Sequence, residues 1–181
     1  MGGKETRLED RLKPIEMLVL DVDGVLTDGG IIYSDRGEEW KQFHVRDGSG
    51  LMIWHWLKKQ SAIITGRTSH IVEVRAREMG ITRVVQGVLD KLPAYEEILE
   101  ECGIKPEQTC YVGDDVPDLP VLRRCGLAAA PADACADVRS VVHYVCQTRS
   151  GRGAVREVIE LILRGQALWN RVLDRFSGEK V

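Results

Sequence analysis

Two aspartates separated by one residue follow a short apolar segment near the start of the chain. Asp21 and Asp23 come directly after Met17–Leu20, and Gly24 follows them. Carboxylates at positions i and i+2 point the same way where a strand ends, and a hard cation such as Mg²⁺ would offset their repulsion. A carboxylate beside Mg²⁺ can attack a phosphoryl group, while the other protonates the leaving alcohol and later activates water. Gly24 permits a tight turn and offers its amide to phosphate oxygens.

Three later segments carry groups that could take part in the same chemistry. They supply a hydroxyl, an amide, two cations and three further carboxylates: Thr65, Gly66, Arg67, Lys91, Asp114, Asp115 and Asp118. Each has an ordinary explanation when taken alone, because acids in turns are often solvated, polar residues after strands cap helices, and a lone lysine is usually on the surface. Together they provide a nucleophile, an acid–base group, metal-binding carboxylates and phosphate-binding cations, which is the set that phosphoryl transfer requires.

The elements that must position these residues are short apolar segments alternating with helical patterns. Strands are expected at Met17–Leu20, Ser61–Thr65, Arg83–Gln86, Thr109–Val112 and Leu127–Ala130, with a short edge strand at His143–Cys146. Helices are expected at Gly50–Lys59, Leu92–Cys102, Pro117–Arg124, Gly153–Leu163 and Gln166–Phe176. Alternation of this kind predicts an α/β, doubly wound, Rossmann-like parallel sheet in a single domain over residues 1–181. The polar groups then follow the carboxyl ends of strands, where such sheets bind ligands.

One segment breaks the alternation. Residues Gly29–Val45 are too many for an ordinary loop of about 2–6 residues between a strand and a helix. Ile31 and Tyr33, the turn at Asp35-Arg36-Gly37 and the arm Glu39–Val45 predict a β-hairpin over about residues 29–46. We expect this hairpin to stand over the carboxyl edge of the sheet, and a helical tail to follow over about residues 150–181.

Composition excludes several classes of protein. The chain has 25 Lys and Arg against 28 Asp and Glu, a net charge of −3, so neither nucleic acid nor membrane is expected as a partner. The five cysteines have no spacing typical of a zinc site or disulfide framework. The polar residues 1–14 do not resemble a signal peptide, and a cytoplasmic location is expected. A P-loop motif is also missing from the sequence, which argues against a nucleotide-driven enzyme.

The order of the motifs resembles the haloacid dehalogenase superfamily of phosphatases, in the subgroup that lacks a large cap domain. The resemblance is carried by Asp21-x-Asp23-Gly24-Val25-Leu26-Thr27, Thr65-Gly66-Arg67, Lys91 and Gly113-Asp114-Asp115-x-x-Asp118. Further matches are Phe43-His44-Val45-Arg46-Asp47-Gly48, Ile81-Thr82, Gln86-Gly87 and Gly151-Arg152-Gly153-Ala154-Val155-Arg156-Glu157. The similarity extends from about residue 17 to residue 163.

The resemblance implies a role for each motif residue. Asp21 would be the nucleophile and a Mg²⁺ ligand, and Asp23 the general acid and base that also binds metal through its backbone carbonyl. Asp114 would complete the protein ligands, supported by Asp115 and Asp118. The implied phosphate-binding residues are Thr65, Gly66, Lys91 and Gly24. The implied substrate-contacting residues are Arg46, Asp47, Arg67, Gly151 and Arg152. Such proteins are homotetramers in which one subunit's hairpin and another's tail complete each active site.

The implied activity is Mg²⁺-dependent hydrolysis of a phosphorylated sugar acid through an aspartyl-phosphate intermediate, as a step of lipopolysaccharide biosynthesis. An eight-carbon 2-keto-3-deoxy acid 8-phosphate is preferred, because Arg67 after Thr65-Gly66 fits that group. A nine-carbon 9-phosphate, a broad range of small phosphate esters, and a non-catalytic oligomerisation module stay open as alternatives. The acidic set argues against the module, since a module has no need of Asp21, Asp23 and Asp114 together.

Overall fold

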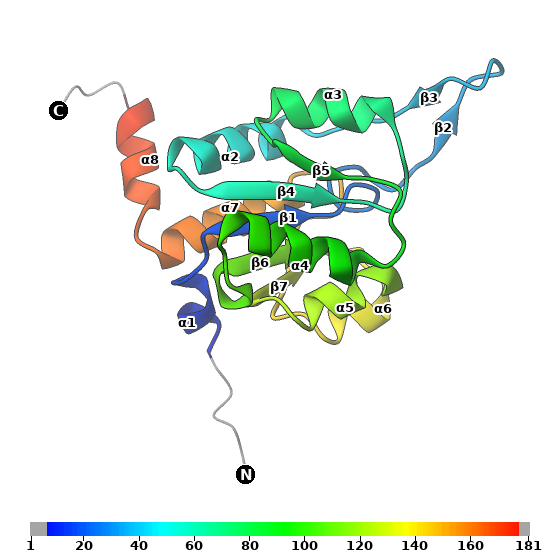
Figure 1. The fold of residues 1–181 in the computed structure, drawn as a ribbon. Coiled ribbons are helices and arrows are strands. Elements are labelled where there is room, and N and C mark those ends of the chain that lie inside the picture. Colours follow the sequence, from blue (N-terminus) through cyan, green and yellow to red (C-terminus); the bar gives the residue numbers. More distant parts are fainter. Residues whose placement is uncertain (1–6, 178–181) are drawn as a thin grey trace, which may run out of the picture.

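A parallel sheet forms the centre of the computed structural model, which describes residues 7–177. Six strands lie in the order β5-β4-β1-β6-β7-β8 (Figure 1). Their bounds are β1 Met17–Leu20, β4 Gln60–Ile64, β5 Arg83–Val85, β6 Thr109–Val112, β7 Leu127–Ala130 and β8 Tyr144–Val145. Every neighbouring pair is parallel, which confirms the predicted α/β doubly wound fold. The ends of the predicted domain 1–181 and tail 150–181 that fall at 1–6 and 178–181 lie outside the described residues.

Strand β1 occupies the middle of the sheet, with β4 on one side and β6 on the other. Leu20 at its carboxyl end pairs with Ile63 of β4 and with Val112 of β6. Because the three strands are parallel and in register, the residues that follow them emerge at the same edge of the sheet. This register places the loops after β1, β4 and β6 side by side.

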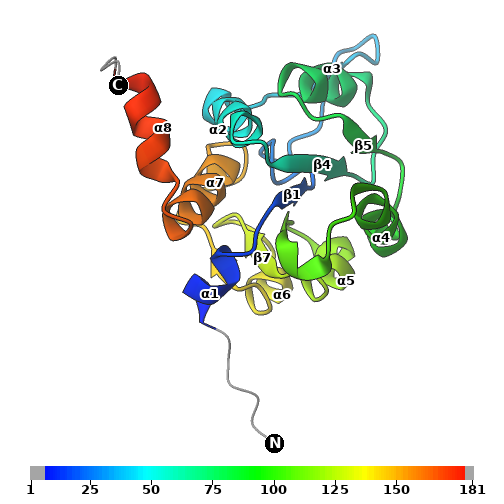
Figure 2. The same cartoon turned by 60° about the vertical axis from the view of Figure 1, so that its left-hand side comes forward.

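Helices cover both faces of the sheet (Figure 2). One face carries α2 Val45–Trp56, α3 His70–Glu78, α7 Ala154–Gly165 and α8 Trp169–Phe176, and the other carries α4 Lys91–Cys102, α5 Leu119–Leu122 and α6 Ala136–Arg139. Residues of β1 alternate between these faces: Leu18 and Leu20 belong to the first core, Met17 and Val19 to the second. A strand buried on both faces has to be apolar throughout, which is why this segment shows no polar alternation.

Two short strands form the expected hairpin, which projects beyond the carboxyl edge of the sheet (Figure 1). They are β2 Ile32–Tyr33 and β3 Glu39–Trp40, paired antiparallel with Ile32 opposite Trp40. The prediction that the second arm runs to Val45 is wrong, because helix α2 begins at that residue, not near Gly50. Asp47 lies in the first turn of α2, where an acidic side chain favours the start of a helix.

The first helix of the described chain and the residue that follows α7 lie together on the face that carries α7 (Figure 1). Helix α1, Leu8–Leu12, lies near α7, and Gln166 after α7 donates hydrogen bonds from Nε2 to the carbonyls of Leu12 at 2.9 Å and Ile15 at 2.8 Å. Helix α8 begins at Trp169 and not at Gln166, because Ala167 adopts a φ of 57°, which no helix accommodates. None of the helices between residues 7 and 177 is long and apolar enough to cross a membrane.

Candidate active site

A cavity of about 180 Å³ opens at the carboxyl edge of the sheet. Its polar lining comes from four segments: Asp21 and Asp23 after β1, Thr65, Gly66 and Arg67 after β4, Lys91 at the start of α4, and Asp114, Asp115 and Asp118 after β6. The structure therefore brings together every residue predicted to act in catalysis or metal binding. The phosphate-binding candidates Thr65, Gly66 and Lys91 lie in the same cavity.

Lys91 lies between two carboxylates at the floor of this cavity. Its Nζ donates to Asp118 Oδ1 at 2.7 Å and lies 3.0 Å from Asp21 Oδ1. The lysine is only 3% exposed. Burial by itself disfavours the ammonium, but the charges of Asp21 and Asp118 outweigh it and raise the pKa of Lys91. The group is therefore a fixed positive charge at neutral pH.

Asp118 has both carboxylate oxygens occupied. Besides Lys91, its Oδ1 accepts a hydrogen bond from the Tyr111 hydroxyl at 2.7 Å. Its Oδ2 accepts the backbone N–H groups of Asp114 at 2.9 Å and Asp115 at 3.2 Å. Asp118 thus holds the loop after β6 in shape and orients Lys91. Asp115 contributes to the same turn, since its Oδ1 accepts the N–H of Val116 at 2.8 Å.

Asp21 and Asp114 are the carboxylates left for a cation. Oxygen atoms of Asp21, Asp114 and Asp118 lie within 4.8 Å of one another. Burial, with the neighbouring carboxylates, raises the pKa of Asp21 to about 6 and that of Asp114 to about 7. The buried Oδ1 of Asp114 accepts no hydrogen bond from residues 7–177. Crowded carboxylates with an unsatisfied oxygen are the donor set that a hard divalent cation prefers, so the residues present fit Mg²⁺.

Gly24 allows the loop after β1 to lie against Asp114. It has a φ of +86°, and a Cβ added there would come within 2.1 Å of Asp114 Oδ2. An L-residue at this position would therefore meet both backbone strain and a direct clash with the carboxylate. The glycine was predicted from its place in the motif as a phosphate contact, and the structure adds this packing requirement.

The hairpin contributes residues that the motif pattern does not include. Lys41 Nζ lies 2.5 Å from Asp23 Oδ1. Glu39 Oε1 accepts from Arg67 Nη2 at 2.7 Å, and Glu39 Oε2 accepts from the Ser69 hydroxyl at 2.6 Å. Arg67 also donates to the Tyr33 hydroxyl at 3.0 Å. A sequence signal existed in the alternation Glu39-Trp40-Lys41, which puts an acid and a base on one face of an extended arm.

Arg46 and Arg152, two of the predicted substrate contacts, lie elsewhere in the described chain. They line a separate cavity of about 400 Å³ between the starts of α2 and α7, which shares no lining residue with the acidic cavity. Gly151 lies against the loop after β1. A Cβ added at Gly151 would come within 2.5 Å of the backbone nitrogen of Asp28, and the Gly151 N–H donates to the Val25 carbonyl at 3.1 Å.

Asp47 does not fit the predicted substrate contact. It is 1% exposed, and its Oδ1 accepts the backbone N–H of Arg156 at 2.8 Å. Asp47 therefore joins α2 to the first turn of α7, where a carboxylate satisfies an otherwise unpaired N–H group. Burial raises the pKa of Asp47, although hydrogen bonds from backbone N–H groups, led by that of Arg156, act in the opposite direction.

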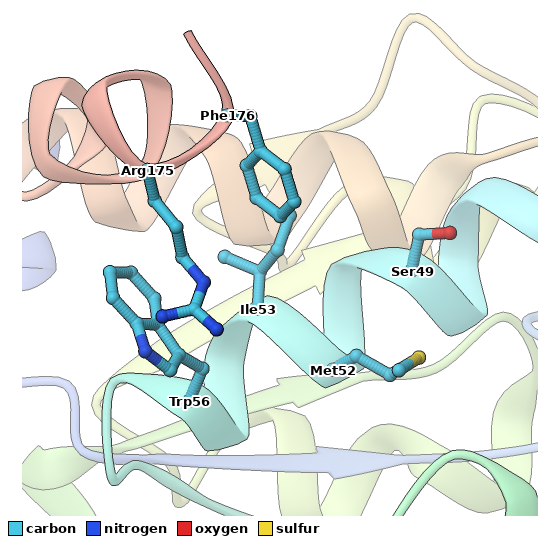
Figure 3. Close-up of a pocket in the computed structure, with 6 residues that line it drawn as sticks. All are labelled: Ser49, Met52, Ile53, Trp56, Arg175 and Phe176. Carbon is cyan, nitrogen blue, oxygen red and sulfur yellow. The ribbon is translucent and has the colours of Figure 1, made fainter. Parts of the chain in front are cut away.

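A larger cavity, of about 460 Å³, lies between α2 and α8 (Figure 3). Its lining is mostly apolar and includes Met52, Trp56 and Phe176, with the Arg175 guanidinium 4.5 Å from the Trp56 ring centre. Trp54 on the same helix is fully buried and donates from Nε1 to the Gln60 carbonyl at 2.7 Å. The lining supplies no carboxylate, so it lacks the groups needed for the chemistry described above.

Comparison with known proteins gives concordant matches. A model of the haloacid dehalogenase-like hydrolases matches residues 38–126. A 3-deoxy-D-manno-octulosonate 8-phosphate phosphatase from Yersinia pestis is 47% identical over 86% of this chain and 83% of that protein. The Salmonella typhi protein of that name is 42% identical over 99% of this chain and 94% of its own. The crystal structure of the Moraxella catarrhalis phosphatase, in complex with magnesium, phosphate and KDO, superposes with a TM-score of 0.91 at 40% identity, covering 93% and 97% of the two chains.

Proposed function

The chain belongs to the haloacid dehalogenase-like hydrolases, in the family of the 3-deoxy-D-manno-octulosonate 8-phosphate phosphatases, and from this premise we propose that it hydrolyses that ester to the free sugar acid and phosphate. The observation that carries the proposal is the fixed ammonium of Lys91 between Asp21 and Asp118, in a cavity that Thr65 and Asp114 also line. That cavity offers negative groups for a metal and positive groups for a phosphoryl oxygen within one small volume. The place in lipopolysaccharide biosynthesis that the family resemblance implies belongs to the same proposal.

Mg²⁺ is the cofactor in this proposal. Asp21, Asp114 and the backbone carbonyl of Asp23 would hold it, while Asp115 and Asp118 support the loop that carries Asp114. The raised pKa values of Asp21 and Asp114 and the unsatisfied Asp114 oxygen support this assignment. When bound, the ion neutralises these carboxylates and the phosphoryl oxygens.

In the first half of the reaction, an Asp21 oxygen attacks phosphorus. Thr65, Gly66, Gly24 and Lys91 bind the phosphoryl oxygens, so that the ester lies against the nucleophile. As the bond from Asp21 to phosphorus forms, the bond from phosphorus to the sugar oxygen breaks, and Asp23 donates its proton to that oxygen. The free sugar acid leaves, and the phosphoryl group stays on Asp21.

In the second half, water releases the phosphoryl group. Asp23, now a carboxylate, takes a proton from the water as its oxygen attacks phosphorus, and the bond to Asp21 breaks. Inorganic phosphate leaves, with Asp21 ionised and Asp23 protonated again. Asp23 lies in the cavity with about a fifth of its side chain exposed, which leaves it open to a leaving group and to water.

Substrate preference rests on Arg67 and on neighbouring subunits. Arg67 lines the acidic cavity, 3.6 Å from Asp23, so a sugar acid held there could meet its guanidinium. In this proposal, one subunit presents Arg46, Gly151 and Arg152 to the active site of another. We leave Asp47 out of the set, because its carboxylate is buried against α7.

A homotetramer is part of the same proposal. The hairpin and helix α2 expose large apolar side chains: Ile31, Ile32, Tyr33, Trp40, Val45 and Met52. Several large exposed apolar side chains on neighbouring elements are typical of a subunit interface. A mass corresponding to four chains in solution would support the assembly, and a fully active monomer would contradict it.

The test of the function is a panel of phosphate esters assayed with Mg²⁺. We expect the eight-carbon 8-phosphate to give the highest kcat/KM, and Asp21→Asn to lower kcat at least about a thousandfold. Asp137→Asn, an exposed aspartate in the first turn of α6, serves as the matched control. Unchanged activity in the Asp21 variant would overturn the proposal, and a tenfold higher kcat/KM for the nine-carbon 9-phosphate would overturn the substrate.

A further inference from the structure

The hairpin buries a lysine beside the acid–base aspartate. Lys41 follows β3, and its side chain is 2% exposed. Its Nζ donates to Asp23 Oδ1 at 2.5 Å and lies 3.6 Å from Glu39 Oε1. Burying an ammonium is costly unless charged partners surround it, so the position requires both carboxylates.

Glu39 is the second carboxylate beside Lys41. It accepts hydrogen bonds from the Ser69 hydroxyl and from Arg67, at 2.6 and 2.7 Å. The hydrogen bond from Ser69 lowers the pKa of Glu39 against the opposing effect of burial, and the Arg67 hydrogen bond and the Lys41 and Arg67 charges lower it further, so Glu39 is ionised at neutral pH. Ser69 and Arg67 belong to the loop after β4 and the start of α3. Lys41 is therefore anchored to the sheet through Glu39.

The contact with Lys41 leaves the two oxygens of Asp23 unequal. Oδ1 accepts from Lys41 and lies 3.4 Å from the Thr27 hydroxyl. Oδ2 has a more distant neighbour, Arg67 Nε at 3.6 Å. A general acid must come within about 2.6–3.2 Å of the atom it protonates, so free rotation of the carboxyl group would weaken catalysis. The hydrogen bond from Lys41 to Oδ1 restricts that rotation and leaves Oδ2 available to another group.

We propose that Lys41 is a positioning residue that holds Asp23 by Oδ1 and presents Oδ2 to the leaving group and then to the attacking water. This inference rests on the proposed phosphatase function and adds a hairpin residue to it. In the first half-reaction the proton on Oδ2 moves to the sugar oxygen as its bond to phosphorus breaks. In the second, Oδ2 takes a proton from water as the bond between Asp21 and phosphorus breaks. Lys41 keeps its own protons throughout.

The test is the release of the alcohol in a single turnover, with enzyme in excess over ester. This measurement isolates the first half-reaction, in which Asp23 acts as an acid. We expect Lys41→Met to slow release from an alkyl ester such as the sugar acid 8-phosphate by about 10- to 100-fold. Release of p-nitrophenol from p-nitrophenyl phosphate should change less than about threefold, because that leaving group departs without a proton.

Three further variants separate positioning from a general loss of structure. Lys41→Arg keeps a cation on Asp23 and should restore most of the alkyl-ester rate. Adding Lys41→Met to Asp23→Asn should slow the reaction no further, because the two residues act as a unit. Lys13→Met removes an exposed lysine that pairs with Asp10 and should leave both rates unchanged.

The outcomes distinguish this inference from the function on which it rests. Equal slowing of both esters by Lys41→Met, or a further loss in the Asp23→Asn background, would overturn the positioning role while the phosphatase assignment stands. If Lys41→Met fails to fold, a Lys41→Arg protein that folds but slows both esters equally would overturn it as well. A wild-type protein that releases no phosphate from any ester would overturn the function, and this inference with it.

Discussion

Gly24 and Asp114 lie so close that a single added methyl group would come within 2.1 Å of the carboxylate oxygen Oδ2. The two residues are far apart in the sequence, and one follows β1 while the other follows β6. The contact ties the backbone that carries Asp21, the proposed nucleophile, to a carboxylate assigned to the metal. A side chain introduced at Gly24 should therefore weaken the binding of Mg²⁺.

The first prediction is that Gly24→Ala weakens Mg²⁺ binding at least about tenfold, because the new Cβ displaces Asp114. Titration calorimetry with Mg²⁺ measures this directly. Gly37→Ala is the matched control, since Gly37 has a similar φ of +80° but no atom within 4 Å of the added Cβ. Equal affinities in the two variants would contradict the role given to the Asp114 contact.

The second prediction concerns Lys91. Lys91→Met removes the fixed positive charge between Asp21 and Asp118 and should lower kcat about 10²- to 10³-fold. Orthovanadate, which resembles the transferring phosphoryl group, should also inhibit the variant more weakly. Lys13→Met again provides an exposed control. A variant that keeps the wild-type inhibition constant would show that Lys91 does not contact the phosphoryl group.

The third prediction is a dependence of stability on pH. The pKa values of Asp21 and Asp114 rise to about 6 and about 7 in the folded protein, above the ordinary value of 3.8. The folded state then binds protons more tightly than the unfolded state, so this contribution to stability is present at low pH and is lost as pH rises through about 4 to 7. Without metal, Tm should fall by at least about 2–4 °C between pH 5 and pH 8 from this source.

Asp114→Asn isolates that contribution. Burial lowers the pKa values of His55 and His143, which changes stability in the opposite direction over part of the same range. Both proteins contain the two histidines, so subtracting one Tm from the other removes the histidine contribution. We expect the Tm of Asp114→Asn to fall less between pH 5 and pH 8 than the Tm of the wild type. Adding Mg²⁺ should raise Tm more at pH 8 than at pH 5, because the ion binds the ionised carboxylates. A larger gain at pH 5 would contradict the assignment of the ligands.

The fourth prediction is that Asp47→Ala destabilises the protein by about 1–3 kcal/mol, measured by urea unfolding. The carboxylate accepts the Arg156 N–H, and its removal leaves that donor in a buried place without a partner. Asp137→Ala, in the exposed first turn of α6, should cost no more than about 0.5 kcal/mol. If Asp47→Ala instead raised KM with unchanged stability, Asp47 would be a substrate contact after all.

Much of the site could be predicted from the sequence because its geometry follows from sheet register. Asp21, Thr65 and Gly113 come directly after parallel strands that pair in register, so their proximity needs no knowledge of packing. The strands Thr109–Val112 and Leu127–Ala130 were predicted with the bounds that the structure has. A continuous apolar segment between two polar turns predicts the bounds of such a buried strand well.

The residues that sequence reasoning missed or misplaced depend on tertiary contacts. Lys41 looks like an ordinary charged residue in a hairpin arm, and only the way the hairpin folds back onto Asp23 buries it. Asp47 matched a motif, yet its partner Arg156 lies in a helix far along the chain. Val45 ends the predicted hairpin arm, whereas the structure places it in the first turn of α2.

The central place of β1 has a consequence for how the protein comes to be active. This strand, with the proposed nucleophile Asp21 directly after it, is synthesised before the other five strands of the sheet, but its Met17 pairs with Gln60 and Thr109, which are made much later. Gly151 and Gln166, later still, pack on the loop after β1 and on the residues before it. Pairings between distant parts of a chain form slowly, because the intervening loop must be closed first. A growing chain therefore carries Asp21 long before it has made the strand that brings Asp114 beside it.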